Sequence, residues 1–290
     1  MTFNRTQHPI LSLHQPYHRY GQPLTGGLSY YLIDFWNDVG DPRTRHLPMM
    51  DNGPWTMLSI MASYLVFVRY IGPQLMKDRQ AFSLHYLMLF YNILLVLINV
   101  YYFAEMLACI NYGWDLMDFQ FPNKFDVSPK AIRLLYSGYG YFLTKFLDLF
   151  DTIFFVLRKK YSQVSTLHLY HHTIVPMLGW LVMRISPTAA PVVLFPICNS
   201  VIHAIMYSYY ALSTFGPRIQ PYLWWKKYLT ILQLYQFVLY GLYFTVFLCL
   251  QTGYPPIYTS VGYVQPFIFF YMFWQYFKCN YCTNTNQCVV

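Results

Sequence analysis

The stretch KFLDLFDTIFFVLRKK, residues 145–160, combines the apolar content of a membrane helix with charged residues inside it and at its end. Lys145, Asp148 and Asp151 follow each other at steps of three, so they share one face of a helix. Charges within a membrane helix are costly and indicate a face turned to the interior of the protein. The basic run at 158–160 is typical of the cytosolic end of a span.

The composition of the whole chain agrees with a location in the bilayer. Of its 290 residues, 56% are hydrophobic, 21% are aromatic and 10% are charged, and the mean hydropathy is +0.30. Soluble domains carry about 25% charged residues. The sequence therefore predicts a protein embedded in a membrane.

Runs of about 20 mostly apolar residues predict transmembrane helices. Seven such runs occur, at residues 55–75, 84–110, 132–157, 168–185, 191–213, 223–250 and 257–277. They lack the alternating pattern of barrel strands, so we expect an all-α polytopic membrane protein with seven transmembrane helices. The runs 168–185 and 191–213 are short, which leaves six spans and one re-entrant segment as an alternative.

The spans divide the chain into an N-terminal segment (1–54), a membrane domain (55–278) and a C-terminal tail (279–290). Basic residues near the span ends gather on one side of the membrane, and most acidic residues outside the spans gather on the other. The positive-inside rule assigns the basic side to the cytosol. We therefore expect a lumenal N-terminus and a cytosolic C-terminus.

Two features of the predicted lumenal side fit this topology. Asn4-Arg5-Thr6 is a glycosylation sequon, which is usable only in the lumen. Cys109 and Cys249 both fall at predicted lumenal helix ends, where they either form a disulfide or are two small side chains.

The formal net charge is +8, and the topology explains most of it. The basic rim at the cytosolic side suits anionic lipid head groups or a soluble anion such as a phosphate-bearing thioester. We expect no nucleic-acid partner.

Polar stripes occur in the neighbouring spans at the same depth. In HLYHH, the histidines at 168, 171 and 172 share one helical face. The next two spans carry further polar stripes, which comprise Asn199, His203, Tyr207 and Tyr210 in one and Thr230, Gln233 and Gln236 in the other. All of these stripes fall in the cytosolic half of their spans, so the sequence predicts one polar chamber that opens to the cytosol.

Three interpretations of this chamber are a metal-dependent enzyme, a receptor and a transporter. Imidazoles at i and i+4 are good metal ligands, but histidine-box membrane desaturases and hydroxylases need more histidines than these spans contain. A metal-dependent lipid oxygenase stays an alternative, although we expect no bound metal. A seven-helix receptor would not need facing His, Asp and Gln side chains, and a transporter would show internal repeats or broken helices.

The remaining interpretation uses imidazole as a base or a nucleophile. A histidine oriented by a carboxylate can stay neutral and basic near pH 7. It could attack a thioester to form an acyl-imidazole, or it could activate a carbon acid. Neutral donors nearby would stabilise an oxyanion or an enolate.

The motifs KFLDLFDT, HLYHH, NSVIHAIMYSYY and TILQLYQ, in this order, resemble the four signature boxes of the very-long-chain fatty acid elongase family. DPRTRHLPM, GPQLM and the YN pair at 91–92 resemble further family segments, so the resemblance covers roughly residues 35–278. Asp148 stands where the family box usually has Glu, and CTNTNQCVV at the C-terminus lacks the usual lysine-based retrieval signal.

This resemblance implies a condensing enzyme of the endoplasmic reticulum membrane. Such an enzyme joins a long-chain acyl-CoA to malonyl-CoA, releases CO2 and CoA, and yields a 3-oxoacyl-CoA longer by two carbons. The implied fold is a seven-helix barrel around a narrow acyl tunnel. No cofactor is implied beyond the substrates. The implied partners are membrane lipid and the ketoreductase, dehydratase and enoyl reductase of the cycle, while a homo-oligomer stays open.

The resemblance also implies roles for individual residues. His171 is our candidate nucleophile, and the histidines expected to carry protons or stabilise the enolate are His168, His172 and His203. The carboxylates expected to orient them are Asp148 and Asp151. The residues expected to bind substrate are Lys145, Asn199, Tyr207, Tyr210, Gln233, Gln236, Lys159 and Lys160. A route without an acyl-enzyme, in which a histidine serves only as a base, stays open.

Overall fold

The computed structural model describes residues 30–51 and 53–282, and within them regular structure is helical apart from one isolated bridge between Gln120 and Thr252. The all-α prediction is therefore confirmed for the described part of the chain. The α-helices are α1 (Phe35–Val39), α2 (Trp55–Val66), α3 (Gly72–Met76), α4 (His85–Cys109), α5 (Pro129–Leu157), α6 (Thr166–Ile185), α7 (Ala190–Ser213), α8 (Lys226–Leu250) and α9 (Pro256–Tyr281).

Among the described residues, four helical stretches are long and apolar enough to cross a membrane. They are Trp55–Met76, His85–Cys109, Ala190–Ser213 and Gln220–Leu250. The first combines α2 and α3 through a π-helical turn at Phe67–Ile71. The protein is therefore a multi-pass membrane protein.

Three further helices are long but more polar. α5, α6 and α9 contain 29, 20 and 26 residues, and each coincides with a predicted span to within about four residues. Their lower hydropathy has a local cause in α5 and α6, which carry the charged and histidine stripes.

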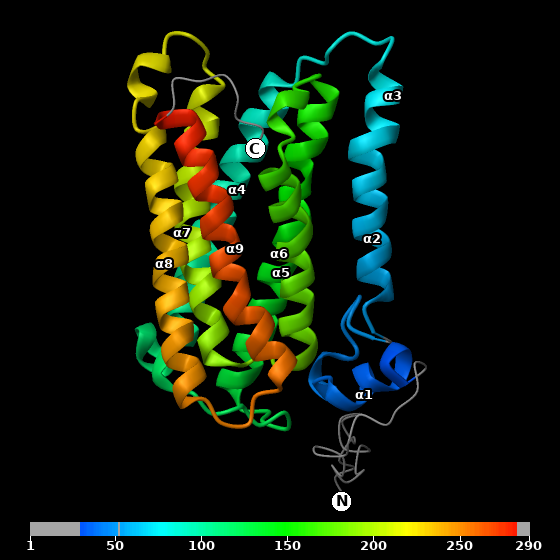
Figure 1. Cartoon of the computed structure of the whole chain (residues 1–290), viewed down its shortest axis with the longest axis vertical. Helices are drawn as coiled ribbons and strands as arrows, with labels where there is room; N and C mark the ends of the chain where they lie inside the picture. The colour runs from blue at the N-terminus through cyan, green and yellow to red at the C-terminus, as the bar shows by residue number, and fades with distance from the viewer. Residues whose placement is uncertain (1–29, 52, 283–290) are drawn as a thin grey trace, which may run out of the picture.

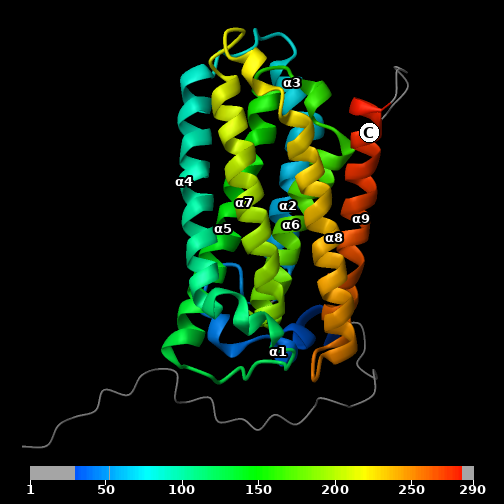
Figure 2. The ribbon, with the colours of Figure 1, turned by 90° about the vertical axis from the view of Figure 1, so that its left-hand side faces the viewer.

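The long helices run side by side along one common direction (Figures 1 and 2). In the described part of the chain, their contacts follow a closed order in which α5 packs on α6, α6 on α9, α9 on α8, α8 on α7, α7 on α4, and α4 on α5. α2 contacts α6, and α3 contacts α5, from outside this ring. The expected barrel of seven helices is thus a ring of six with the first predicted span beside it.

The two ends of the bundle differ in charge. One end, which we call the basic end, contains the end of α3, the end of α5, the start of α8 and the end of α9 (Figure 1). Its basic residues are Lys77, Arg79, Arg158, Lys159, Lys160, Arg218, Lys226, Lys227 and Lys278. The opposite end, which we call the α1 end, contains α1 and the connections from α4 to α5 and from α8 to α9 (Figure 2).

Backbone and cationic groups tie the α1 region to the bundle. Arg184 of α6 is completely buried, and its Nη2 donates to the carbonyl oxygen of Trp36 at 2.6 Å. The backbone N–H of Asp41 donates to the carbonyl oxygen of Arg184 at 2.7 Å. Lys124, in the loop after α4, donates to the carbonyl oxygen of Val39, and burial lowers the pKa of this lysine to about 8.

Cys109 and Cys249 do not form the disulfide that the sequence left open. Cys109 and Cys249 are free thiols, the first buried and the second exposed. The Sγ of Cys109 lies 3.5 Å from Oε1 of Glu105, one turn back on α4, and 4.0 Å from Oγ of Ser137 on α5. The expected glycosylation site at Asn4 lies outside the described residues, as do residues 283–290 of the predicted tail.

Candidate active site

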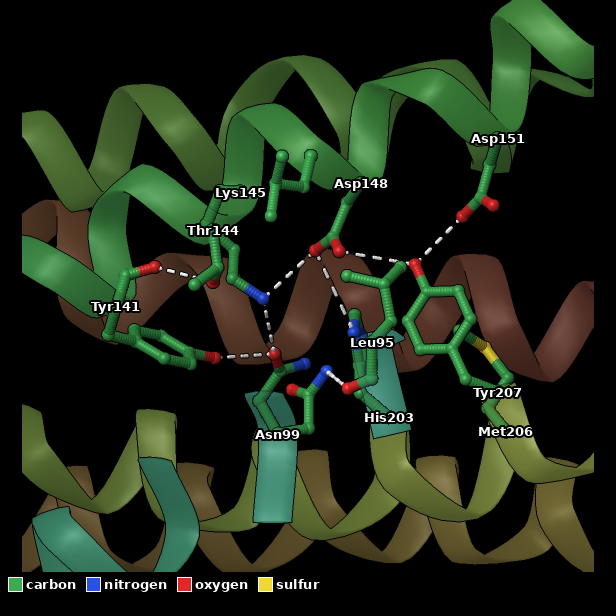
Figure 3. A network of polar contacts seen from close by, with 12 residues as sticks. Leu95, Asn99, Tyr141, Thr144, Lys145, Asp148, Asp151, His203, Met206 and Tyr207 are labelled. Carbon is green, nitrogen blue, oxygen red and sulfur yellow. Dashed lines mark hydrogen bonds and ion pairs between the residues drawn. The ribbon is translucent and has the colours of Figure 1, made fainter. Parts of the chain in front are cut away.

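The charged stripe of α5 meets the polar stripe of α7 in the interior of the bundle (Figure 3). Lys145 and Asp148 form a buried ion pair, with Nζ 2.9 Å from Oδ2. Nζ of Lys145 also donates to Oδ1 of Asn199 at 3.3 Å, and the Tyr141 hydroxyl donates to the same oxygen at 2.6 Å. A buried ion pair is tolerated only when further hydrogen bonds satisfy its atoms, and Asn199 provides one of them to Lys145. The ammonium group of Lys145 also lies over the ring of Tyr141, 4.5 Å from its centroid.

The phenol of Tyr207 joins the two carboxylates of α5. Its oxygen lies 2.8 Å from Oδ2 of Asp151 and 3.2 Å from Oδ1 of Asp148 (Figure 3). A phenol has one proton to donate, so it serves one carboxylate at a time, with the shorter contact to Asp151. In the described part of the chain, Asp151 forms no ion pair, and the hydrogen bond from Tyr207 is its contact with a donor on α7.

The four predicted histidines lie together across α6 and α7. The ring centroids of His168 and His172 are 4.1 Å apart, and those of His171 and His172 are 5.3 Å apart. The ring of His171 lies 5.9 Å from that of His203 on α7. His172 and His203 are buried, while His168 and His171 are partly buried. The prediction of one histidine cluster is thus met by the geometry.

The carboxylates were expected to orient the histidines, but the distance between the two kinds of group is longer than a hydrogen bond. Nδ1 of His203 lies 3.8 Å from Oδ2 of Asp148, which is within ion-pair distance but too long for a hydrogen bond. Among the described residues, Asp148 and Asp151 form no hydrogen bond to an imidazole. The carboxylates can therefore influence the histidines through their electric field. The ring of Tyr207 lies 5.7 Å from that of His203.

His168 is held by a different set of groups. Its Nε2 lies 2.8 Å from Oγ1 of Thr152 on α5, and that hydroxyl lies 2.6 Å from the Tyr64 hydroxyl on α2. We call Tyr64, Thr152 and His168 the hydroxyl relay. The relay connects the helix outside the ring to the histidine cluster, because α2 packs on α6.

Two ring nitrogens lack a partner within the described protein. Nδ1 of His172 and Nδ1 of His203 are buried and make no hydrogen bond to the described residues. A buried polar atom of this kind is normally satisfied. These nitrogens are therefore available for a proton or for a substrate group.

Other predicted residues stand apart from this network. Tyr210 packs its ring against Tyr207 at 5.9 Å, whereas Gln233 makes a weak contact of 4.0 Å to the sulfur of Met206. Gln236 is buried on α8, and within the described part of the chain it makes no hydrogen bond to the histidines. The predicted substrate-binding residues Lys159 and Lys160 lie at the basic end, beyond the last turn of α5.

The sequence interpretation missed the contribution of α4 to the interior. Asn92 and Asn99 are both almost fully buried, and Nδ2 of Asn99 donates to the carbonyl oxygen of Leu95 at 2.8 Å. Two asparagines seven residues apart lie on one helical face, which is a signal that the sequence carried. No comparable signal marks Tyr64 or Tyr141, because the chain contains 30 tyrosines.

An apolar cavity adjoins the polar network. It has a volume of about 140 Å³ and is bounded by residues of the six helices α4 to α9. Lys145 and Tyr141 of the network are part of its wall, and so is Phe269, whose ring lies 5.7 Å from that of His171. Tyr258, in the first turn of α9, and Pro187, between α6 and α7, line it toward the α1 end. The cavity can therefore accommodate an apolar group next to the histidines.

Among the described residues, no three His, Cys, Asp or Glu side chains converge in a way that could hold a metal ion. The histidines contact one another and aromatic rings, and His168 contacts a hydroxyl group. The arrangement supports acid–base or nucleophilic chemistry by imidazole.

The helices and the interior define a multi-pass α-helical membrane protein with a buried cluster of histidines beside carboxylates and an apolar cavity. Comparison with known proteins identifies the group within that class. The family model described as "ELO: GNS1/SUR4 family" matches residues 48–288. The chain belongs to this family, that of the very long chain fatty acid elongases, which confirms the predicted resemblance.

The individual relatives agree with the family model. The "Very long chain fatty acid elongase 7" of Drosophila melanogaster is 37% identical over 262 residues, which cover 88% of this chain and 78% of the relative. The "Very long chain fatty acid elongase 1" of Homo sapiens is 36% identical over 251 residues, which cover 84% and 85%. These similarities favour an enzyme of fatty acid elongation over a metal-dependent oxygenase or a receptor.

Proposed function

We propose that this protein is the condensing enzyme of fatty acid elongation, a membrane 3-oxoacyl-CoA synthase. The observation that supports this proposal best is the position of the histidine cluster beside an apolar cavity. An acyl chain in the cavity would place its thioester end near His171. The relatives named as very long chain fatty acid elongases support a long acyl-CoA as the substrate.

The first step transfers the acyl group. A ring nitrogen of His171 attacks the thioester carbonyl, the carbon–sulfur bond breaks, and CoA leaves as a thiol after it takes a proton. An acyl-imidazole is then bound to His171. His172 lies 5.3 Å away between ring centroids and has an unpartnered Nδ1, which makes it the candidate proton carrier.

The second step forms the new carbon–carbon bond. Malonyl-CoA loses CO2, and the electron pair of the broken bond stays on the substrate as an enolate. Its carbon attacks the acyl-imidazole, the carbon–nitrogen bond breaks, and 3-oxoacyl-CoA is released. We assign the stabilisation of the enolate oxygen to His203; its buried Nδ1, which makes no hydrogen bond to the described residues, and its ring contact with His171 support this assignment.

The polar network around Lys145 would hold these groups in position. The Lys145–Asp148 pair, Asn199 and Tyr207 fix α5 against α7, and α7 carries His203. The alternative is direct condensation, in which a histidine acts only as a base. Both routes need the histidine cluster, but only the first bonds it to the acyl group.

The expected topology is part of the proposal. We propose seven spans, in which α5, α6 and α9 cross the membrane beside the four apolar stretches, and an acyl tunnel that continues the cavity. The same proposal includes the domain division at residues 54 and 278 and residence in the endoplasmic reticulum. It also includes a lumenal N-terminus and a cytosolic basic end. Cooperation with the reductases and dehydratase of the elongation cycle follows from the reaction, because its product is their substrate.

The decisive experiment is acyl trapping. Purified protein is incubated with acyl-CoA alone and denatured, and the peptide containing residues 168–172 is analysed by mass spectrometry. We expect the acyl mass on His171, and its loss in His171→Ala. Condensation of radiolabelled malonyl-CoA without any acylated histidine would establish direct condensation instead, and no labelled 3-oxoacyl product at all would overturn the proposed function.

A further inference from the structure

A second cavity lies at the basic end, away from the histidines. Its volume is about 590 Å³, and it opens between the end of the α2–α3 helix and the chain that follows α5. The residues that line it are Arg69, Tyr70, Pro73, Gln74, Lys77, Lys159 and Tyr161. We call it the basic pocket. None of the histidines or carboxylates of the candidate active site lines it.

The walls of the basic pocket are tied together. Nζ of Lys159 donates to the carbonyl oxygen of Lys77 at 3.1 Å, and the backbone N–H of Phe82 donates to the carbonyl oxygen of Leu157 at 3.1 Å. Gly72 packs so closely on α5 that an added Cβ would lie 2.7 Å from Cγ1 of Val156. The pocket is therefore part of the α3–α5 contact and keeps its shape with the bundle.

The charge of the pocket is one-sided. Its lining includes Arg69, Lys77 and Lys159, and it includes no carboxylate. Within residues 30–51 and 53–282, none of these three side chains forms an ion pair. Lys159 also adopts a left-handed backbone conformation, with φ of 55°, which a residue other than glycine rarely adopts. Three cations around one hollow repel each other, and an anion between them would relieve that repulsion.

The surroundings of the pocket indicate which anion fits. In the stretch Trp55–Met76, only 28% of the apolar part is buried inside the protein, so most of its surface faces outward. Next to the pocket, Tyr70, Ile71 and Leu75 expose 73%, 48% and 56% of their surface. The pocket thus lies where an apolar helix face ends at the basic end, which is the depth of phospholipid head groups.

We propose that the basic pocket binds the phosphate of an anionic phospholipid, with the acyl chains along the exposed face of α2 and α3. Arg69 and Lys77 donate charge-assisted hydrogen bonds to the phosphate oxygens, and Lys159 adds a third positive charge. The apolar face beside the pocket distinguishes a lipid from a soluble phosphate compound, which would need no such surface. The phosphates of CoA are the competing source of the same chemistry.

The test measures lipid retention by native mass spectrometry on the full-length protein purified in a neutral detergent. Dioleoyl phosphatidic acid and dioleoyl phosphatidylcholine are the probes. The pocket variant is Arg69→Gln/Lys77→Gln, and the matched control is Arg218→Gln/Lys226→Gln, which removes two exposed charges from the same end. Lys77→Gln alone serves as a second variant. It removes one cation of the pocket and, like the double variant, keeps the backbone carbonyl of Lys77 that Lys159 uses.

We expect wild type and control to retain phosphatidic acid in preference to phosphatidylcholine. Two lost cations should weaken this retention in the pocket variant by up to roughly 30-fold. Excess CoA or inorganic phosphate should not displace the lipid. Equal retention by pocket and control variants would overturn the proposal, because it would mean unspecific charge attraction. Displacement by CoA would also overturn it and would assign the pocket to the substrate.

Discussion

The phenol of Tyr207 has more influence on the candidate site than its position in a run of tyrosines indicates. It is completely buried, and it is the hydrogen-bond donor common to Asp148 and Asp151. Without the Tyr207 hydroxyl, Asp151 loses this hydrogen bond in a site that water does not reach. A buried polar group that loses its hydrogen-bond partner is costly, so this residue should matter for activity as well as for stability.

We predict that Tyr207→Phe lowers the rate of condensation by about 10- to 100-fold, which corresponds to the cost of leaving a buried polar group without its hydrogen bond. The rate is measured as the release of 3-oxoacyl product from radiolabelled malonyl-CoA. Tyr209→Phe is the matched control, because the Tyr209 ring packs on Trp225 and not on the carboxylates. An unchanged rate in Tyr207→Phe would contradict the role given to this phenol.

The hydroxyl relay is the second feature at this scale. Tyr64 does not contact the histidines itself, so it is a positioning residue that acts through Thr152 on His168. We expect Tyr64→Phe to lower kcat by roughly threefold to tenfold with little change in KM, because substrate binding does not depend on the orientation of His168.

Two further variants test whether the relay acts as a unit. Thr152→Val should reproduce the effect of Tyr64→Phe, and the double variant should lose little more, since both break one chain of hydrogen bonds. Thr152→Ser should keep most of the activity. Additive losses in the double variant would show that the two hydroxyl groups act separately.

The Lys145–Asp148 pair gives a prediction on stability. Lys145→Met leaves a buried carboxylate without its cation and should destabilise the protein by about 3 to 5 kcal/mol. The thermal unfolding midpoint in detergent measures this effect. Lys130→Met is the control, because Lys130 pairs with Asp115 while most of its own side chain stays exposed, and such pairs contribute about 1 kcal/mol or less.

At the scale of elements, the contact between α8 and α9 controls one wall of the cavity. Gly262 of α9 lies directly against Phe244 of α8, and an added Cβ would lie 2.5 Å from Cζ of that ring. Phe244 is completely buried and lines the cavity together with Gly262. A larger residue at 262 must therefore push the ring or separate the helices.

We predict that Gly262→Ala destabilises the protein by about 1 to 3 kcal/mol, the usual effect of overpacking. It should also reduce activity toward the longer acyl-CoAs of a chain-length series, since the displaced ring narrows the cavity. Gly241→Ala on α8 is a matched control, because its Cβ would meet neighbours only at 3.8 Å. Equal chain-length profiles for the two variants would contradict this account of the cavity wall.

At the scale of the whole molecule, the α1 end depends on buried cations that hold the segment before α2. Lys124 and Arg184 both donate to carbonyl groups of this segment, from the α4–α5 loop and from α6. The folded state lowers the pKa of Lys124 from 10.5 to about 8, because burial disfavours the charged form. Between these two values the unfolded chain binds more protons than the folded one.

Stability should therefore rise with pH over this interval. We predict that the free energy of unfolding of wild type increases relative to that of Lys124→Gln between pH 8 and 10, by an amount on the order of 2 kcal/mol. Below pH 8 the lysine is charged in both states, so the difference should be flat there. A difference that falls as the pH rises would mean that the folded state favours the charged lysine.

Much of the fold was readable from the sequence. The helices α4 to α9 begin and end close to the predicted spans, because membrane helices depend mainly on local hydropathy. The stripes of α5, α6 and α7 were also visible, since the helical period alone places their residues on one face. The resemblance of the motifs to the family boxes then led to the prediction that the histidines are the reactive groups.

The sequence could not show how these faces are turned toward one another. Tertiary structure decided that Asp151 is satisfied by Tyr207, that Tyr64 reaches His168 through Thr152, and that α2 lies outside the ring. It also assembled the basic pocket from α3 and the end of α5. The reason is physical: hydropathy and helical period are properties of each segment alone, whereas hydrogen-bond partners depend on the rotation and depth of helices that are distant along the chain.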